Sequence, residues 1–127
     1  MHPIAITSTA IPHPVMAYSQ AVKVGDLLFI AGQPGIDFKS GLIANDFETQ
    51  ARQAFTNLSI VLQAAGSSLE KVAKTTIWLV DGSNFDCLNK LYAEYFPTNP
   101  PARSTPVVAL PRPEFQLSIE AIATVGE

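Results

Sequence analysis

The fold is decided by Pro-Pro-Ala-Arg-Ser-Thr-Pro at residues 100–106 and Leu-Ser-Ile-Glu-Ala-Ile-Ala at residues 117–123. The two prolines hold the backbone extended and exclude a helix. After a Pro-rich corner at residues 111–113, residues 115–124 alternate polar and apolar side chains, which predicts a strand. We expect the two runs to pair as a hairpin, so that Arg103 converges with Ser118 and Glu120 on one face.

Arg103 is the candidate binding residue of this stretch. Its planar guanidinium can hold a carboxylate through two parallel N–H groups. The extended backbone of the two preceding prolines would fix the direction of its side chain. An arginine at the surface can equally form an exposed ion pair of little energetic value. The sequence leaves both interpretations open.

The remaining elements are predicted from periodicity and turn signals. Residues 47–65 have apolar side chains at helical spacing, with Asn45 as N-cap and Gly66 as the residue after the helix. A second helix begins near Ser83 and ends before Pro97. Strands are expected at residues 16–22, 27–30 and 71–80, and the small residues at 31–35 end the second of them.

The predicted order is therefore ββαβαββ in one α+β domain spanning residues 1–127. Two helices can cover only one face of a single sheet. The other face still carries apolar residues, including one side of the Ile-Trp-Leu-Val run at residues 77–80. Because a patch of that size is rarely left in water, we predict a homo-oligomer.

Composition excludes several classes of function. The net charge is −3 with eight scattered Lys and Arg residues, which argues against a nucleic-acid partner. No apolar run is long enough to span a membrane and no secretory signal is visible, so we expect a cytoplasmic protein. The soft ligands His2, His13 and Cys87 have no metal-site spacing, and neither a metal nor another cofactor is predicted.

Several motifs together resemble one family. They are Ala-Tyr-Ser-Gln-Ala at residues 17–21, Ala-Gly-Gln at 31–33, Gln-Ala-Arg-Gln-Ala at 50–54, Lys-Thr-Thr at 74–76, Asn89 with Tyr92, Pro-Ala-Arg-Ser at 101–104 and Ile-Glu-Ala-Ile-Ala at 119–123. The chain resembles the RidA or YjgF reactive-intermediate deaminases, also known as the L-PSP endoribonuclease family. The resemblance implies a chorismate-mutase-like fold, assembled as a homotrimer with a central β-barrel and clefts between subunits.

The resemblance also implies an activity and a site. Such proteins hydrolyse enamine and imine acids to 2-keto acids and ammonia. Carried over by position, the catalytic set is Arg103, Tyr18 and Ser118, and the substrate-binding set is Arg103, Ala31, Gly32, Asn89, Thr105 and Glu120.

Ser118 is the main departure from the RidA pattern. RidA proteins have a glutamate fifteen residues after the arginine, where this chain has Ser118, and a cysteine where it has Thr105. A serine can hold a water but cannot act as a base near neutral pH. Three functions stay open: deamination of a small imine or enamine acid, binding of a small carboxylate without catalysis, and the RNA cleavage suggested only by the family's older name.

Overall fold

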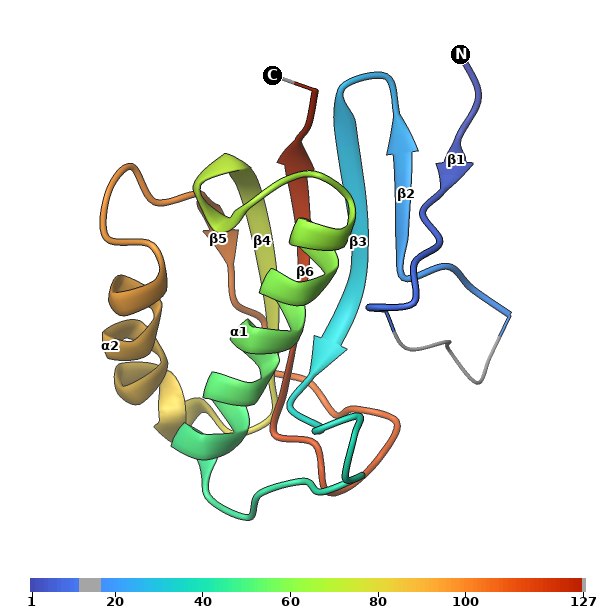
Figure 1. The fold of residues 1–127 in the computed structure, drawn as a ribbon. Coiled ribbons are helices and arrows are strands. Elements are labelled where there is room, and N and C mark those ends of the chain that lie inside the picture. Colours follow the sequence, from blue (N-terminus) through green and yellow to red (C-terminus); the bar gives the residue numbers. More distant parts are fainter. Residues whose placement is uncertain (12–16, 127) are drawn as a thin grey trace.

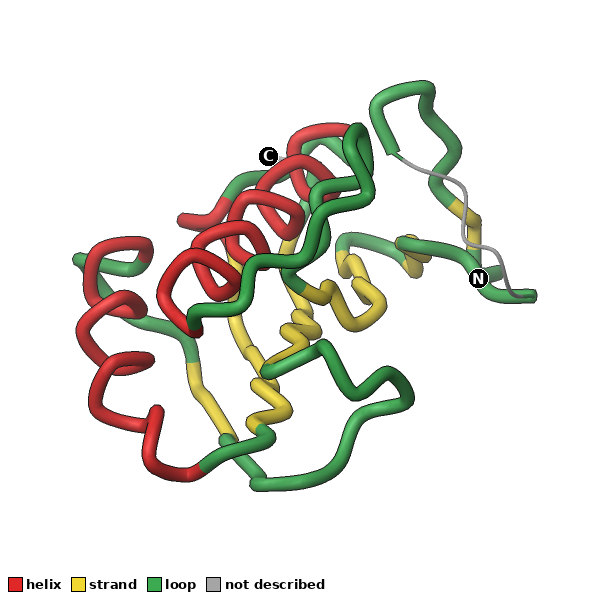
Figure 2. The backbone as a smooth tube through the Cα atoms, turned by 90° about the horizontal axis from the view of Figure 1, so that it is seen from below, coloured by secondary structure: helices red, strands yellow, loops and turns green. Residues whose placement is uncertain are grey.

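The protein folds as one six-stranded sheet with two α-helices on one side of it. The computed structural model describes residues 1–11 and 17–126. The elements are β1 (Ile4–Ala5), β2 (Ala21–Val24), β3 (Leu27–Pro34), α1 (Phe47–Ala64), the 3-10 turn η1 (Leu69–Lys71), β4 (Val72–Leu79), the 3-10 turn η2 (Gly82–Asn84), α2 (Phe85–Tyr95), β5 (Ala102–Ser104) and β6 (Leu117–Thr124). Figures 1 and 2 show both helices on the same side of the sheet.

The last strand of the chain lies inside the sheet, whose order is β1-β2-β3-β6-β4-β5. β6 pairs antiparallel with both β3 and β4. Its alternation is confirmed, because Leu117 and Ile119 are fully buried while Ser118 and Glu120 are only partly covered. The predicted α+β class and the strand over the end of the chain are therefore correct.

The predicted hairpin between β5 and β6 is wrong. β4 lies between these two strands, and β5 runs parallel to β4. The physical reason is the helix between them: α2 carries the chain back to the end at which β4 began, so the next strand must run in the same direction. Residues 105–116 then cross past β4 before β6 begins.

The N-terminal part also differs from the prediction. β1 was not expected, and it pairs antiparallel with β2 over only two residue pairs. The described part of the predicted first strand begins as β2 at Ala21, whereas residues 12–16, which include His13 and the predicted start of that strand, lie outside the described residues. The second strand was expected to stop at Ala31, but β3 continues to Pro34 through a bulge.

Helix α1 follows the predicted range closely, but its N-cap is Asp46 rather than Asn45. The Asp46 carboxylate accepts a hydrogen bond of 2.9 Å from the backbone N–H of Thr49, as an N-cap does. The backbone carbonyl of Asn45 instead accepts from the Gln116 side chain at 2.7 Å. Gly66 follows the helix with φ of +82°, the left-handed conformation predicted for it.

Helix α2 begins two residues later than expected. A 3-10 turn precedes it, and the Asp81 carboxylate accepts from the backbone N–H of Ser83 at 2.9 Å. The helix ends at Tyr95, before Pro97, as predicted.

The two faces of the sheet differ in how well they are covered. The helix side holds the core, whose largest fully buried side chains include Phe55, Leu58, Leu62, Ile77, Leu79 and Leu117. On the opposite side, which we call the open face, Leu27 and Phe29 remain 41% and 43% exposed. Among the described residues, no helix has the length and apolar character needed to cross a bilayer.

Candidate functional site

The strand pairing fixes the face on which each candidate residue lies. Arg103 of β5 stands opposite Thr75 of β4. Thr75 is fully buried and bonded to Tyr92 of α2, so Arg103 also points to the helix side. The next residue on β4, Thr76, faces the other way and stands opposite Glu120.

Arg103 is the centre of a first group of side chains, which we call the arginine cluster. One terminal nitrogen, Nη2, donates a hydrogen bond of 2.7 Å to Oδ1 of Asn89. The guanidinium carbon lies 4.7 Å from the centre of the Tyr92 ring and 5.5 Å from the centre of the Phe85 ring. Asn89, Tyr92 and Phe85 all come from α2, so among the described residues one helix face supplies these three contacts of the guanidinium.

No carboxylate of the described residues lies within 4 Å of the Arg103 nitrogens. The ion pairs found in this part of the chain belong instead to Arg52, with Glu48 and Glu94, and to Arg112, with Glu114. The surface ion pair considered for Arg103 is therefore not seen. In the part of the chain that the structure describes, the other N–H groups of Arg103 have no hydrogen-bond partner, so they can receive an anion from outside.

Ala31, Gly32 and Ser118 form a second group, the bulge cluster. The register between β3 and β6 shifts between Ile30 and Gln33, so Ala31 and Gly32 have no regular partner on β6. The Ser118 hydroxyl fills this space, since a Cβ atom placed on Gly32 would lie only 2.6 Å from its Oγ. A glycine here lets the hydroxyl reach the backbone.

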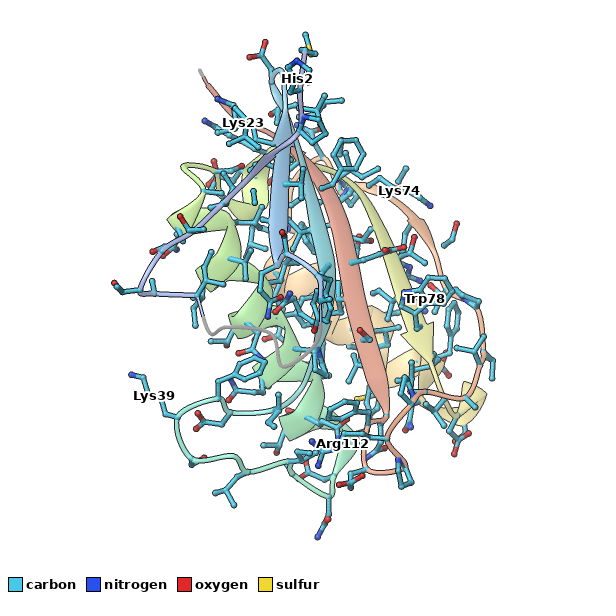
Figure 3. The ribbon with its side chains drawn as sticks, turned by 90° about the vertical axis from the view of Figure 1, so that its right-hand side faces the viewer. His2, Lys23, Lys39, Lys74, Trp78 and Arg112 are labelled. Atoms are coloured by element: carbon cyan, nitrogen blue, oxygen red, sulfur yellow. The ribbon has the colours of Figure 1, made fainter. Side chains whose placement is uncertain are left out.

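Glu120 lies further along the open face from Ser118. It borders a small hollow of about 190 Å³ together with Lys74, Thr76 and Phe29. The Lys74 ammonium donates a hydrogen bond of 2.8 Å to the Ser104 hydroxyl. Figure 3 shows Lys74 and Trp78 extending from β4 on the side away from α1.

Like Glu120, the predicted site residues Tyr18 and Thr105 join neither cluster. Tyr18 precedes β2 and is 51% exposed. Thr105 directly follows β5 and is partly buried. Within the described residues, neither side chain forms a hydrogen bond with another candidate.

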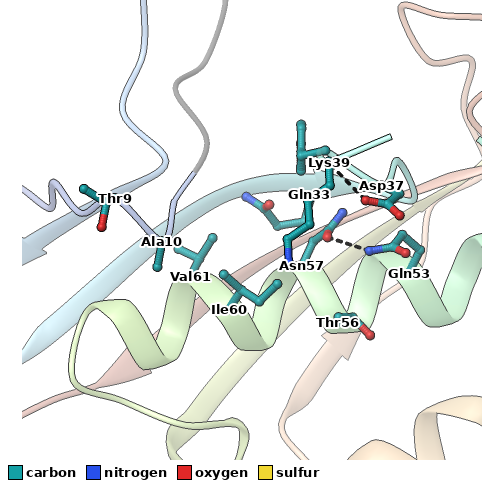
Figure 4. Close-up of a pocket in the computed structure, with 11 residues that line it drawn as sticks. Thr9, Ala10, Gln33, Asp37, Lys39, Gln53, Thr56, Asn57, Ile60 and Val61 are labelled. Carbon is teal, nitrogen blue, oxygen red and sulfur yellow. Dashed lines mark hydrogen bonds between the residues drawn. The ribbon is translucent and has the colours of Figure 1, made fainter. Parts of the chain in front are cut away.

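A larger hollow of about 430 Å³ lies between α1 and the N-terminal segment, and none of the predicted site residues lines it. Gln33 and Asn57 stand in its wall, and Figure 4 shows the bond of 2.9 Å from the Gln53 amide to Asn57. The Asn57 amide in turn donates to the carbonyls of Pro34 and Ile36, both at 2.8 Å. These polar groups hold the chain after β3 against α1, which is a structural role.

The two clusters lie on opposite faces of the sheet. Trp78 of β4 stands opposite Ser118, so Ser118 and Glu120 both point to the open face while Arg103 points to the helix side. The expectation that Arg103 converges with this polar row within one chain is wrong. It failed because it rested on a hairpin, and the parallel β4 that separates β5 from β6 turns Arg103 to the other face.

The sequence did not predict that Tyr92 would lie beneath Arg103 or that Thr75 would hold the Tyr92 hydroxyl. Both stood in motifs noted above, and Tyr92 follows Asn89 by three residues, a spacing that puts the two on one helix face. The signal for Tyr92 was ambiguous, since an aromatic residue at that spacing also fits a helix packed on a core.

Comparison with known proteins settles the family. The sequence model named endoribonuclease L-PSP matches residues 8–125. The chain belongs to this family. A RutC family protein of Pyrococcus horikoshii is 44% identical over 97% of this chain and 98% of its own. The 2-iminobutanoate/2-iminopropanoate deaminase of Mus musculus is 42% identical over 95% of this chain and 90% of its own.

A solved structure of a related protein agrees with this fold. A Rid-family protein of unknown function, YyfA from Yersinia pestis, superimposes with a TM-score of 0.91 at 38% identity, covering 98% of this chain and 100% of that one. The mixed α+β fold with one sheet and two helices is thereby confirmed, as is the resemblance to the RidA and YjgF proteins.

Proposed function

We propose that this chain hydrolyses small imine and enamine carboxylic acids to 2-keto acids and ammonia in the cytoplasm. Water adds to the imine carbon, and the resulting tetrahedral adduct expels ammonia as its C–N bond breaks and the C=O bond forms. An enamine first takes a proton on carbon to become the imine. The deaminase name of the mouse relative supports this reaction. No metal or covalent nucleophile is needed, because an iminium carbon is already electrophilic and positioning plus one oriented water suffices.

Arg103 is the observation that carries the proposal. Its guanidinium is fixed by Asn89 and by the Tyr92 ring, yet it has no carboxylate partner among the described residues. A fixed arginine with free N–H groups suits a planar carboxylate, which it can hold bidentately. Every imine acid and keto acid of this class carries such a group.

The site is proposed to lie between subunits of a homotrimer built around a central β-barrel. Arg103 and Ser118 lie on opposite faces of one sheet, so a single chain cannot present both to one small molecule. A second copy placed against the open face would bring its own Arg103 toward the Ser118 of the first copy, so that one small molecule could contact both. The same contact would cover Leu27 and Phe29, which are otherwise exposed.

Ser118 favours a second candidate, a carboxylate-binding protein without catalysis. Its hydroxyl can orient a water beside Gly32, but it cannot remove a proton from that water near neutral pH. If the missing carboxylate limits hydrolysis, the native chain acts slowly on 2-aminoacrylate, the simplest enamine acid, and a different imine is its proper substrate. If nothing replaces that carboxylate, only binding remains.

The first experiment measures binding of 2-oxobutanoate by titration calorimetry. Arg103→Ala should abolish the heat of binding while leaving the unfolding transition in place, because Arg103 lies in a three-residue edge strand and forms no ion pair among the described residues. Arg103→Lys is the matched variant: it keeps the charge but loses the two-pronged geometry, so binding should weaken without vanishing. Unchanged affinity in Arg103→Ala would refute the carboxylate-binding role.

The second experiment measures ammonia release from enzymatically generated imino acids. The native protein should act slowly on 2-aminoacrylate, and Ser118→Glu should raise the rate by a small part of the roughly 10²–10⁴-fold that acid–base assistance provides. A fast native protein would show that another group already supplies the base. Binding of 2-oxobutanoate without ammonia release from any imine would favour the binding protein.

Sedimentation velocity tests the assembly. A trimer is expected at micromolar concentration. A well-folded monomer would remove the proposed cleft between subunits.

A further inference from the structure

Tyr92 has an unusual position for a residue at the edge of a core. One face of its ring lies under the Arg103 guanidinium, at 4.7 Å from ring centre to guanidinium carbon. Tyr92 is only 7% exposed, whereas Phe85, the other ring near this guanidinium, is 42% exposed. Tyr92 is therefore the buried aromatic contact of the guanidinium, and Phe85 is the exposed one.

The Tyr92 ring cannot easily turn. Its hydroxyl shares a buried hydrogen bond of 2.7 Å with Oγ1 of Thr75, the residue in register with Arg103. On the core side its ring lies 4.7 Å from Phe96 and 6.1 Å from Phe55, measured between ring centres. The hydroxyl bond and the two aromatic neighbours together keep the ring in one orientation, with one face toward the Arg103 guanidinium.

The ionisation state of Tyr92 suits this role. Burial raises the pKa of its hydroxyl, and the Thr75 hydrogen bond and the positive charge of Arg103 offset only part of that rise. The ring therefore stays neutral at physiological pH. A phenolate at this place would compete with an incoming carboxylate for the guanidinium, and a neutral ring does not.

We infer that Tyr92, locked by Thr75, is a positioning residue that holds the Arg103 guanidinium in the orientation that receives a carboxylate. This inference rests on the proposed function, since it assigns a task to the same arginine. Asn89 holds one terminal nitrogen, and the Tyr92 ring lies beneath the guanidinium carbon as a cation–π partner. A guanidinium ordered in advance gives up less conformational freedom when the ligand binds.

The test compares three single variants by their dissociation constants for 2-oxobutanoate. Tyr92→Leu removes the ring and should weaken binding about tenfold, the range of a partly desolvated cation–π contact plus lost ordering. Tyr92→Phe keeps the ring but frees it from Thr75, so binding should weaken by a smaller amount, about threefold, the worth of one lost hydrogen bond. Tyr95→Leu is the matched control: Tyr95 also belongs to α2, but its ring stacks on Phe55 at 4.4 Å, and no contact with Arg103 is found.

Two further readouts separate positioning from a general loss of structure. The neutral amide of 2-oxobutanoic acid should bind native protein and Tyr92→Leu equally, because it offers Arg103 no carboxylate. With an imine acid as substrate, Tyr92→Leu should raise KM and leave kcat within about twofold, since the ring does not touch the reacting carbon. A fall in kcat with unchanged KM would overturn the inference.

The failure of this inference and the failure of the proposed function give different results. If Arg103→Ala binds 2-oxobutanoate as well as the native protein does, the proposed function fails. If Arg103→Ala loses binding but Tyr92→Leu equals Tyr95→Leu, only the positioning role fails. Should Tyr92→Leu not fold, Thr75→Val takes its place, because it keeps the side-chain volume and removes the oxygen that holds the Tyr92 hydroxyl. Weaker binding than in Tyr95→Leu then supports the inference, and equal binding overturns it.

Discussion

Replacing Gln50 by leucine should destabilise the protein more than any comparable change on the surface of α1. Gln50 is fully buried. Its amide nitrogen donates to the carbonyls of Ala44 at 2.9 Å and Glu114 at 3.0 Å, and its amide oxygen accepts from the backbone N–H of Gln116 at 2.6 Å. One side chain thus joins α1 to the segment before it and to the segment that leads into β6.

The expected loss follows from these three hydrogen bonds. Each is worth about 0.5–1.5 kcal/mol net, so their removal should lower the free energy of unfolding by about 2–4 kcal/mol. Leucine occupies nearly the same volume, so a cavity adds little to this figure. For a chain of this length the change corresponds to a Tm lower by roughly 10 °C.

Urea unfolding followed by circular dichroism measures the effect, at one fixed protein concentration because association would shift the midpoint. Gln63→Leu is the control: Gln63 is an exposed residue of the same helix, and among the described residues its amide donates one hydrogen bond, to the Ser59 hydroxyl at 3.3 Å. That variant should stay within about 0.5 kcal/mol of the native protein. A loss in Gln50→Leu no larger than in Gln63→Leu would refute the view that Gln50 holds the two segments.

Three further changes test other parts of the fold. Gly35→Ala should give little folded protein, because its Cβ atom would overlap the backbone of α1, and recovery of normal soluble yield would contradict this packing. Hydrogen bonds from Thr49 lower the pKa of Asp46, so the advantage of the native chain over Asp46→Asn in urea should be full above the ordinary carboxyl pKa of 3.8 and disappear as the pH falls below it; a pH-independent difference would contradict the cap. Gly32→Ala should destabilise the chain by crowding the Ser118 hydroxyl, and adding Ser118→Ala should restore part of the loss, whereas additive losses would place the hydroxyl elsewhere.

Local periodicity was enough to predict the elements that carry their own signal. Helix α1 was found because its apolar residues recur every three to four positions over five turns, and β6 because its polar and apolar residues alternate. The N-cap was harder, since Asn45 and Asp46 are adjacent and both have suitable side chains. The choice depends on which residue keeps an extended backbone next to the first helical residue, and that residue is Asp46.

The face of Arg103 could not be predicted, because it depends on which strand β5 joins. Three residues of β5 give no pattern long enough to indicate a partner, and pairing with β6 or with β4 fits the local sequence equally well. That choice is made by the path of α2, which is a property of the whole chain. The role of Tyr92 depends on the same choice, since its ring meets Arg103 only because β5 lies beside β4.

The lengths of the outermost strands limit how copies of this chain can meet. β1 has two residues and β5 has three, whereas β3, β4 and β6 each have eight. A neighbouring chain that tried to extend the sheet sideways would find few free backbone groups to bond with, so growth into a continuous ribbon is disfavoured. Packing of copies on the open face of the sheet does not depend on strand length. Once that face is covered, no further copy can be added there. The geometry therefore favours closed assemblies of defined size over open-ended aggregates.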